Sequence, residues 1–311
     1  MTNAGSRTGW TMALAAMLAV APAAMAETPE ASASGIVELE VKPSSADPAI
    51  SAFDHPHRVL YDPRRRDGNL LVFLSGTSER PGPGPQAFLR TAVAQGYRVV
   101  NLAYISYPAV SQVCVGGRLR LQPDCAAHFR QRRLYGDIAF PAIPDQPADA
   151  IVVRLGKLLR HLANTDPAGG WDRYLEDGRP NWSRIAVAGQ SQGGGMAEFL
   201  GKRETLARVL AFSGGWDHAA PGGRYASWYA NEAATPAERW YYAYHAKEPF
   251  AGQLAGIGAV LRLPEGHVMA FDQPLSKRTM RARMPGHGSS INDAVYAAEW
   301  KRMLGRGDAA P

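Results

Sequence analysis

Cysteine is scarce in this 311-residue sequence, which contains two, Cys114 and Cys125. Two thiols without histidines nearby at ligand spacing do not make a zinc site. Neither cysteine stands between a predicted strand and a predicted helix, which argues against a catalytic thiol. In an oxidising compartment such a pair forms a disulfide, and we predict one that closes the loop between the two residues.

Nucleotide-binding motifs are absent as well. No G-x-x-x-x-G-K-[ST] loop occurs, and the glycines at 193–195 do not follow the dinucleotide fingerprint, so we expect no cofactor. The formal net charge is +6, but the basic residues are scattered apart from the runs at 64–66 and 130–133. A nucleic-acid partner would need a basic stripe with interleaved aromatics. We therefore expect solvated surface arginines and no nucleic-acid partner. The positive net charge is compatible with a mild preference for anionic substrates or surfaces.

Long hydrophobic runs are absent after the N-terminus. Residues 11–24 form an apolar, alanine-rich run behind a single positive charge, and Ala24-Met25-Ala26 fits the small-x-small cleavage pattern. This is typical of a signal peptide over residues 1–26, cleaved after Ala26. The alternative, an N-terminal membrane anchor, is disfavoured because the run is short for a span. We expect a periplasmic or secreted protein without a stable membrane anchor, with one domain over residues 27–311.

Apolar runs alternate with segments of helical periodicity along the chain. Runs that are apolar throughout predict strands buried on both faces of a sheet. We expect strands at 35–43, 57–63, 69–76, 97–106, 184–189, 207–215, 239–245 and 267–273, and helices at 85–96, 145–167, 192–204 and 289–305, the last with Ser289 or Ser290 as its N-cap. This order predicts an α/β fold with a mostly parallel central sheet of about eight strands, helices on both faces and an antiparallel first edge. Inserts are expected near 107–144 and 217–242.

The most informative motif is RIAVAGQSQGGGM at residues 184–196. An apolar run leads into Gly189-Gln190-Ser191-Gln192-Gly193, and a segment of small residues follows. At such a corner between strand and helix the serine is strained, and its side chain stands above the edge of the sheet. A side chain at Gly189 or Gly193 would collide with the neighbouring chain. The N-terminus of the helix would face negative charge developing at the serine. The alternative is a glycine-rich turn with an idle serine.

The corner and the order of elements around it resemble the α/β-hydrolase family, which includes secreted bacterial esterases and lipases. The resemblance covers most of the chain after residue 26. It implies a nucleophile at Ser191, an acid after a later strand and a histidine near the C-terminus, in that order. His287, in the glycine-flanked loop before the last predicted helix, stands where the family keeps its base. His267, at the start of a predicted strand, is the alternative, and His245 is typical of a packed core histidine.

Two acids are candidates for the partner of the histidine. Glu248 follows the second strand after the corner, where the family usually places its acid, and Asp217 follows the first, a position that some members use. We favour Glu248 and keep Asp217 open; Asp172 or Asp272 would compete only if the predicted strands were misplaced. His245 and Glu248 are three residues apart, as metal ligands on a helix are, but a strand is predicted there, so we expect no metal site.

An oxyanion hole requires two backbone N–H donors. The resemblance implies that one belongs to Gln192, the residue after the nucleophile, and the other to the loop after an earlier strand. That loop is LSGTSERPGPGP at 74–85, in which we choose Thr77. Ser75 stands where the family often has a histidine, which leaves the second donor open.

These residues predict an exported serine hydrolase that cleaves a carboxylic ester, of a small molecule or a polymer, through an acyl-enzyme. The ester follows from the resemblance alone. Trp228, Tyr229 and Trp240 in the second insert either clamp an apolar acyl group or pack the insert onto the sheet. A peptidase or amidase with the same residues is an alternative. So is a noncatalytic periplasmic binding protein that retains the fold, although a complete set of serine, histidine and acid argues against it.

Overall fold

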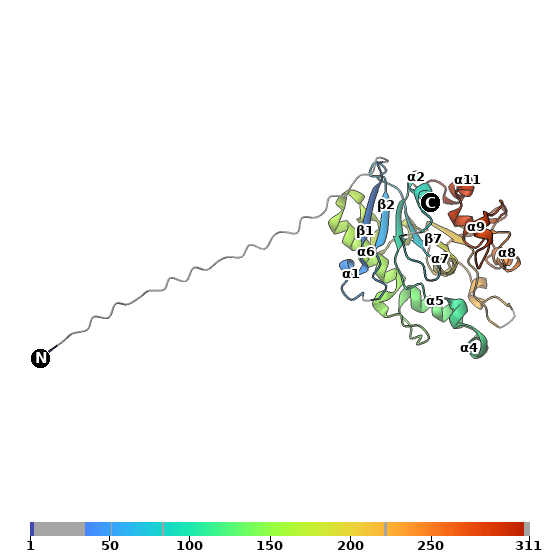
Figure 1. Ribbon diagram of the computed structural model, residues 1–311, viewed down its shortest axis with the longest axis horizontal. Helices are drawn as coiled ribbons and strands as arrows, with labels where there is room; N and C mark the ends of the chain where they lie inside the picture. The colour runs from blue at the N-terminus through green and yellow to red at the C-terminus, as the bar shows by residue number, and fades with distance from the viewer. Residues whose placement is uncertain (3–34, 51, 83, 221–222, 308–311) are drawn as a thin grey trace.

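The computed structural model describes residues 1–2, 35–50, 52–82, 84–220 and 223–307. The predicted signal peptide and its cleavage site therefore lie almost entirely outside the described residues. Eight strands form the central sheet (Figure 1): β1 Val37–Val41, β2 His57–Tyr61, β3 Leu70–Leu74, β4 Arg98–Leu102, β7 Ile185–Gln190, β8 Arg208–Phe212, β9 Trp240–His245 and β10 Val268–Phe271. The two remaining strands, β5 Leu175–Glu176 and β6 Arg179–Pro180, form a small separate hairpin.

The strands lie in the order β1-β2-β4-β3-β7-β8-β9-β10. β2 pairs antiparallel with both β1 and β4, and every other pair in the sheet is parallel. The carboxyl ends of β3, β7, β8 and β9 therefore meet along one edge, where ligands of open α/β sheets bind. The predicted fold class, a mostly parallel sheet of about eight strands with an antiparallel first edge, is confirmed.

Helices cover both faces of this sheet (Figure 1). Their bounds are α1 Pro43–Ala46, α2 Gln86–Ala94, α3 Val110–Val113, α4 Gly116–Leu121, α5 Cys125–Tyr135, α6 Ile151–Thr165, α7 Gln192–Arg203, α8 Ala251–Val260, α9 Lys277–Met280, α10 Ser289–Asn292 and α11 Ala297–Leu304. Along β3, Leu70, Val72 and Leu74 enter the core built with α5, α6, α7 and α8. Leu71 and Phe73 enter the core built with α2, α10 and α11. Burial on both faces explains why this strand is apolar throughout.

The prediction of a single helix over residues 289–305 is wrong. It is divided into α10, the 3-10 helix η7 Ala294–Tyr296, and α11. The break falls at Asp293, which has an extended backbone and accepts a hydrogen bond from the Val295 amide through its side chain. Neither serine is the N-cap, because Gly288, at φ 83°, precedes the first helical residue.

The helix predicted over 145–167 begins later than expected, at Ile151. Residues Pro147–Asp149 form a separate 3-10 turn, η1. Asp149 closes that turn by accepting from the Gln146 amide, and its carboxylate also pairs with Arg154 at 2.8 Å. A side chain that caps and pairs in this way stabilises a break in the helical pattern.

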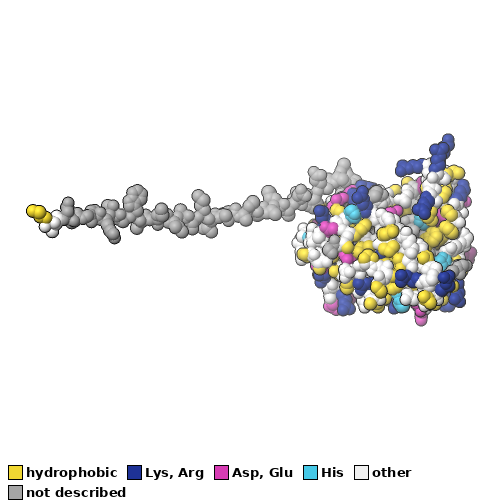
Figure 2. Space-filling model, turned by 60° about the horizontal axis from the view of Figure 1, so that its bottom comes forward, with side chains coloured by type: hydrophobic (Ala, Val, Ile, Leu, Met, Phe, Trp, Pro, Cys, Tyr) yellow, Lys and Arg dark blue, Asp and Glu magenta, His cyan; other side chains and the backbone are white. Residues whose placement is uncertain are grey.

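The first insert is mostly helical, since α3, α4 and α5 lie within it. The predicted disulfide between Cys114 and Cys125 is present and joins the end of α3 to the first residue of α5. The expectation of solvated arginines is wrong here, because Arg130 and Arg133 are buried and each pairs with an aspartate. Other Lys and Arg side chains are dispersed over the surface and project at its upper right in Figure 2. No helix within the described ranges is long and apolar enough to cross a membrane.

Candidate active site

Ser191 stands at the corner between β7 and α7, with φ 53° and ψ −114°. A non-glycine residue rarely adopts a positive φ, so this backbone is strained and must be held by its surroundings. The Ser191 amide donates to the carbonyl of Phe212, at the end of β8, over 2.8 Å. The first turn of α7 follows directly, and its N–H groups lack partners within the helix. The corner therefore combines a strained serine with a helix N-terminus that favours negative charge.

The glycines around the serine are required by close backbone approach. A Cβ on Gly189 would lie 2.2 Å from the carbonyl oxygen of Gly193, and one on Gly193 would lie 1.9 Å from that of Leu74. Both distances are too short for any side chain to be accommodated. The contact at Gly193 also shows that the loop after β3 lies directly against the first turn of α7, which brings the two predicted oxyanion segments together.

His287 lies in a turn that folds back toward this corner. The flanking Gly286 and Gly288 have φ 78° and 83°, a conformation that residues with a side chain rarely adopt. A Cβ on Gly286 would lie 3.3 Å from the His245 ring, at the end of β9. The glycine on each side thus lets the chain pack closely against the end of the sheet. The His287 side chain keeps 15% of its surface exposed.

Glu248 is the acid that meets His287. Its Oε2 lies 2.7 Å from His287 Nδ1, while its Oε1 accepts from the Ser213 hydroxyl at 2.6 Å and from the His245 amide at 2.8 Å. The carboxyl side chain is fully buried. Three donors from three different segments fix its position, and the contact with Nδ1 orients the His287 ring.

Asp217, the alternative acid, lies elsewhere. Its carboxylate forms a bidentate ion pair with Arg130 of α5, at 2.6 and 3.0 Å, and also accepts from the Trp228 indole at 2.9 Å. Both Asp217 and Arg130 are fully buried. Arg130 donates further to the main-chain carbonyl of Gln192 at 3.0 Å. Asp217 therefore holds Arg130, which binds the backbone next to Ser191, and its carboxylate forms no hydrogen bond with His287.

Gln190 is a site residue that the sequence analysis missed. Its amide nitrogen lies 3.2 Å from His287 Nε2, and a Cβ on Gly76 would lie 2.4 Å from its amide oxygen. The side chain is buried between the loop after β3 and the histidine. The only sequence signal was its place directly before the serine, at the end of a buried strand.

The loop predicted to hold the second oxyanion donor forms a turn from Gly76 to Glu79. The Gly76 amide donates to the Glu79 carboxylate at 2.8 Å, and the Glu79 amide donates to the Gly76 carbonyl at 3.2 Å. The Tyr104 hydroxyl donates to the carbonyl of Ser75 at 2.6 Å and fixes the start of the turn. Thr77 lies within this turn and is half-buried. The Gly76 amide is occupied by Glu79, so Thr77 rather than Gly76 is the candidate donor in this turn.

The aromatic residues of the second insert pack the insert onto the sheet. Trp228, Tyr229 and Trp240 are buried, and Trp228 stacks edge-on against Phe199 of α7 at 5.1 Å. Of the two interpretations left open for them, the structure favours packing. The aromatic beside the site is instead Trp216, whose ring lies 5.8 Å from that of His287 and 5.4 Å from that of the exposed Phe250.

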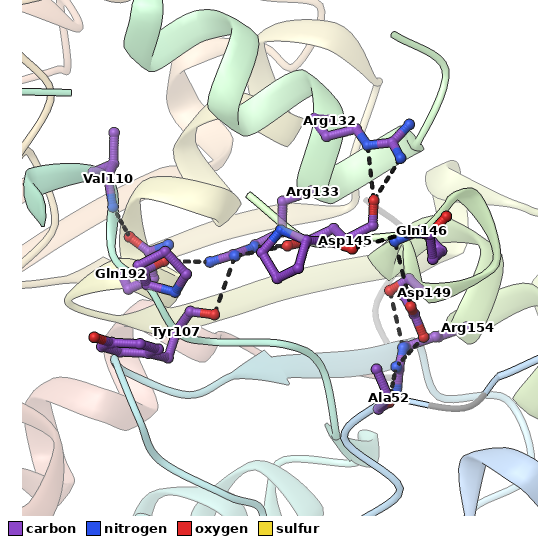
Figure 3. A network of polar contacts seen from close by, with 12 residues as sticks. Ala52, Tyr107, Val110, Arg132, Arg133, Asp145, Gln146, Asp149, Arg154 and Gln192 are labelled. Atoms are coloured by element: carbon purple, nitrogen blue, oxygen red, sulfur yellow. Dashed lines mark hydrogen bonds and ion pairs between the residues drawn. The ribbon is translucent and has the colours of Figure 1, made fainter. Parts of the chain in front are cut away.

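The first insert is tied to the corner through a buried polar network (Figure 3). Gln192 accepts from the Val110 amide at 3.3 Å through its side chain. Arg133 binds the carboxylate of Asp145 at 2.8 and 2.9 Å and donates to the carbonyl of Pro108 at 2.7 Å. The start of the first insert is thus held against α7 by Gln192 and against α5 by Arg133.

The other histidines that the sequence singled out have structural positions. His267 Nδ1 lies 2.7 Å from the Trp240 carbonyl, and its ring stacks on Tyr241. His245 is buried, with Nε2 3.0 Å from the Gln273 carbonyl and Nδ1 accepting from the Lys247 amide. Among the described residues, no group of three or more His, Cys, Asp and Glu side chains is placed to hold a metal ion.

Two cavities flank the pair of His287 and Gln190. One, of about 590 Å³, is lined by Gln190, Glu79, Phe73 and Ile291 among others. The second is an open groove of about 700 Å³ lined by His287 and by residues of the segment 278–293. Both volumes suit a small organic ligand.

Comparison with known proteins gives matches among solved structures alone. No protein-family model matches the chain, and no curated protein matches it. A bacterial heroin esterase is 15% identical with a TM-score of 0.46 and covers 88% of this chain and 85% of its own. An esterase from the bacterial hormone-sensitive lipase family is 15% identical with a TM-score of 0.46, covering 88% and 86%. A dienelactone hydrolase from Anabaena variabilis is 13% identical with a TM-score of 0.44, covering 86% and 98%.

Such identities and TM-scores say nothing about the reaction of this chain. The chain itself has the features of the fold. Its sheet is parallel from β4 to β10, and its strained serine ends β7 at the N-terminus of a helix. A histidine and an acid from later segments meet at the same edge, in the chain order serine, acid, histidine. Together these features show that the chain has an α/β-hydrolase fold.

Proposed function

We propose that this protein is a serine hydrolase that cleaves carboxylic esters through an acyl-enzyme, with Ser191, His287 and Glu248 as its catalytic residues. The observation that carries the proposal is the 2.7 Å contact between His287 and the buried Glu248 carboxylate, at the edge where the strained Ser191 stands. A base oriented by an acid beside a nucleophile at a helix N-terminus is the arrangement that acyl transfer requires.

Acylation begins when the Ser191 hydroxyl attacks the ester carbonyl carbon and His287 Nε2 takes the hydroxyl proton. Glu248 holds the ring with Nδ1–H directed at its carboxylate, so Nε2 is the nitrogen that accepts. The carbonyl oxygen becomes an oxyanion, to which the amides of Gln192 and Thr77 donate. The oxyanion then re-forms the carbonyl, the bond to the alcohol oxygen breaks, and His287 returns its proton to that oxygen.

Deacylation repeats these steps with water in place of the serine. His287 removes a proton from water, which attacks the acyl carbon, and the proton then passes to Ser191 as the acid is released. The substrate is a small-molecule or polymer ester. Gln190 must give up its contact with Nε2 for either half-reaction to proceed.

Export to the periplasm or the medium belongs to the same proposal. The disulfide between Cys114 and Cys125 supports it, because such bonds persist in oxidising compartments. Expression of the full chain in a bacterium with an export system, followed by intact-mass measurement, tests this. A protein that begins at Glu27 would support export, and a cytoplasmic protein that begins at Met1 would contradict it.

The test of the activity uses p-nitrophenyl esters with acyl chains of about two to sixteen carbons. We expect hydrolysis by the full chain and its loss, by at least about a thousandfold in kcat, in Ser191→Ala. The matched control is Ser183→Ala, an exposed serine that precedes β7 at the opposite edge of the sheet. It should retain full activity.

A fluorophosphonate reagent adds a second readout, because it labels the activated serine in any enzyme of this type. Labelling at Ser191 without ester turnover, together with cleavage of p-nitroanilides, would indicate the amidase alternative. A folded protein that is neither labelled nor active would favour the noncatalytic binding protein.

A further inference from the structure

The open groove of about 700 Å³ beside His287 is lined by two arginines. Arg278 and Arg281 contribute to its wall together with His287, and the remaining lining residues are Thr279, Ala282, Gly288, Ser289, Asn292 and Asp293. Both arginines belong to or directly follow α9, and both are exposed. The groove thus joins the proposed catalytic base to a basic wall.

The charge on this wall is not neutralised by the protein. Four cations, Lys277, Arg278, Arg281 and Arg283, lie within seven residues, and the sequence from 276 to 288 contains no acid. No ion pair of these four is found in the part of the chain that the structure describes. By contrast, Arg130, Arg133 and Arg154 each bind an aspartate.

Two acids lie at the groove, and each is already bound within the protein. Glu248 is buried against His287. Asp293 lines the groove, and its side chain accepts from the Val295 amide. The lining of the groove therefore carries two arginines and one aspartate.

The position of the groove identifies which part of a substrate it would receive. His287 takes the serine proton and gives it to the leaving oxygen, so the alcohol part of the ester must lie on the histidine side. A groove lined by His287 therefore accommodates the alcohol part, and a basic wall there favours an alcohol part that is negatively charged.

We propose that the esters cleaved by this protein carry an anionic group, a carboxylate or a phosphate, on the alcohol part, and that Arg278 and Arg281 bind it. The inference rests on the proposed function for its mechanism, but the binding of the anion can be measured without turnover. The arginines would act as specificity residues and would take no part in proton transfer.

The test compares 4-acetoxybenzoate with the neutral 4-acetoxybenzamide. The kcat/KM of each ester is divided by its rate constant for hydrolysis by hydroxide, which corrects for the different reactivity of the two esters. We expect kcat/KM to favour the anionic ester by about tenfold at low salt, since an exposed ion pair contributes about two- to fivefold. The preference should fall toward unity in Arg278→Gln/Arg281→Gln and at 1 M NaCl, where screening is strong. Arg66→Gln, which removes an exposed charge near the opposite end of β3, should keep the preference.

A binding measurement keeps the inference falsifiable if neither ester is cleaved. Calorimetry on Ser191→Ala should show tighter binding of 4-hydroxybenzoate than of 4-hydroxybenzamide, and the difference should vanish in the Arg278→Gln/Arg281→Gln background. 4-Hydroxyphenyl phosphate in the same experiment distinguishes a preference for phosphate from one for carboxylate. Equal binding of the charged and neutral phenols, or a preference that survives the double substitution, would overturn the proposal whether or not the protein is an esterase.

Discussion

The side-chain amide nitrogen of Gln190 lies 3.2 Å from Nε2 of His287, the nitrogen that accepts the Ser191 proton in the proposed mechanism. A neutral imidazole whose Nδ1–H points to Glu248 has a single acceptor lone pair, at Nε2. In the proposed mechanism Ser191 would use the lone pair that faces Gln190 in this structure. The proposed mechanism therefore requires this contact to break before Ser191 is activated.

Replacement of Gln190 by methionine, which keeps the length of the side chain but lacks the N–H group, removes this contact. A neutral hydrogen bond contributes about 0.5–1.5 kcal/mol, so kcat/KM for a p-nitrophenyl ester should rise about two- to tenfold. Stopped-flow measurement of the acylation burst checks this. A decrease instead would mean that Gln190 orients the ring, and the requirement for this contact to break would be refuted.

Substitutions at the two acids should have different consequences. Glu248→Gln leaves the shape of the side chain intact but removes the charge that orients His287, so kcat should fall about 10³- to 10⁴-fold with little change in unfolding. Asp217→Asn leaves the buried Arg130 without its counter-ion. We expect it to lower the free energy of unfolding by about 3–5 kcal/mol, as measured by denaturant titration. If Asp217→Asn abolished ester hydrolysis while its free energy of unfolding was unchanged, the assignment of Glu248 as the acid would be wrong.

The disulfide should stabilise the first insert. Cys114 and Cys125 are 11 residues apart, a short loop, for which the expected contribution is about 2–3 kcal/mol. Cys114→Ser/Cys125→Ser should therefore have a lower midpoint of unfolding than the oxidised protein. Addition of dithiothreitol should destabilise the original protein and leave the variant unaffected. An effect of reductant on the variant would mean that the reductant acts elsewhere.

Glu198 makes stability depend on pH. This buried side chain of α7 has its pKa raised to about 8, chiefly because burial disfavours the carboxylate, although the nearby Arg130 opposes the rise. The pKa is higher in the folded than in the unfolded chain, so the stabilisation is complete below about pH 4.5. It is lost as the pH rises through about 8.

Glu198→Gln should remove this dependence. Thermal unfolding between pH 5 and 9 should show that the variant loses less stability than the original protein, with the largest difference at the alkaline end. Parallel curves for the two proteins would show that Glu198 is ionised in both states. Glu238→Gln, an exposed acid on the 3-10 helix Ala237–Arg239, serves as the control for removal of one charge.

The corner around Ser191 could be predicted because its requirements are local. Gly189 and Gly193 leave no room for a side chain, and the apolar run before them is buried on both faces, so the short sequence already implies the geometry. The sheet was predictable for the same reason, since each buried strand carries its own continuous apolar pattern.

The partners of the corner depend on contacts between distant segments. Glu248 and Asp217 both follow strands at the same edge, and Arg130, 87 residues before Asp217, binds one of them. Nothing near Asp217 in the sequence indicates this pairing. The sequence around Trp228 is equally compatible with a pocket residue and with a packing residue. The hydrogen bond from its indole to the Asp217 carboxylate is visible only in the structure. The break at Asp293 was missed because the apolar periodicity continues on both sides of it.

Arg130 has a consequence for attempts to redesign the molecule. It belongs to the first insert, yet it donates to the carbonyl of Gln192, the residue after Ser191. A chimera that exchanges residues 107–144 for the corresponding segment of another protein with this fold would therefore remove a support of the backbone beside Ser191. Segment exchanges intended to change substrate preference should instead begin after α5, or should keep the ion pair of Arg130 and Asp217 intact.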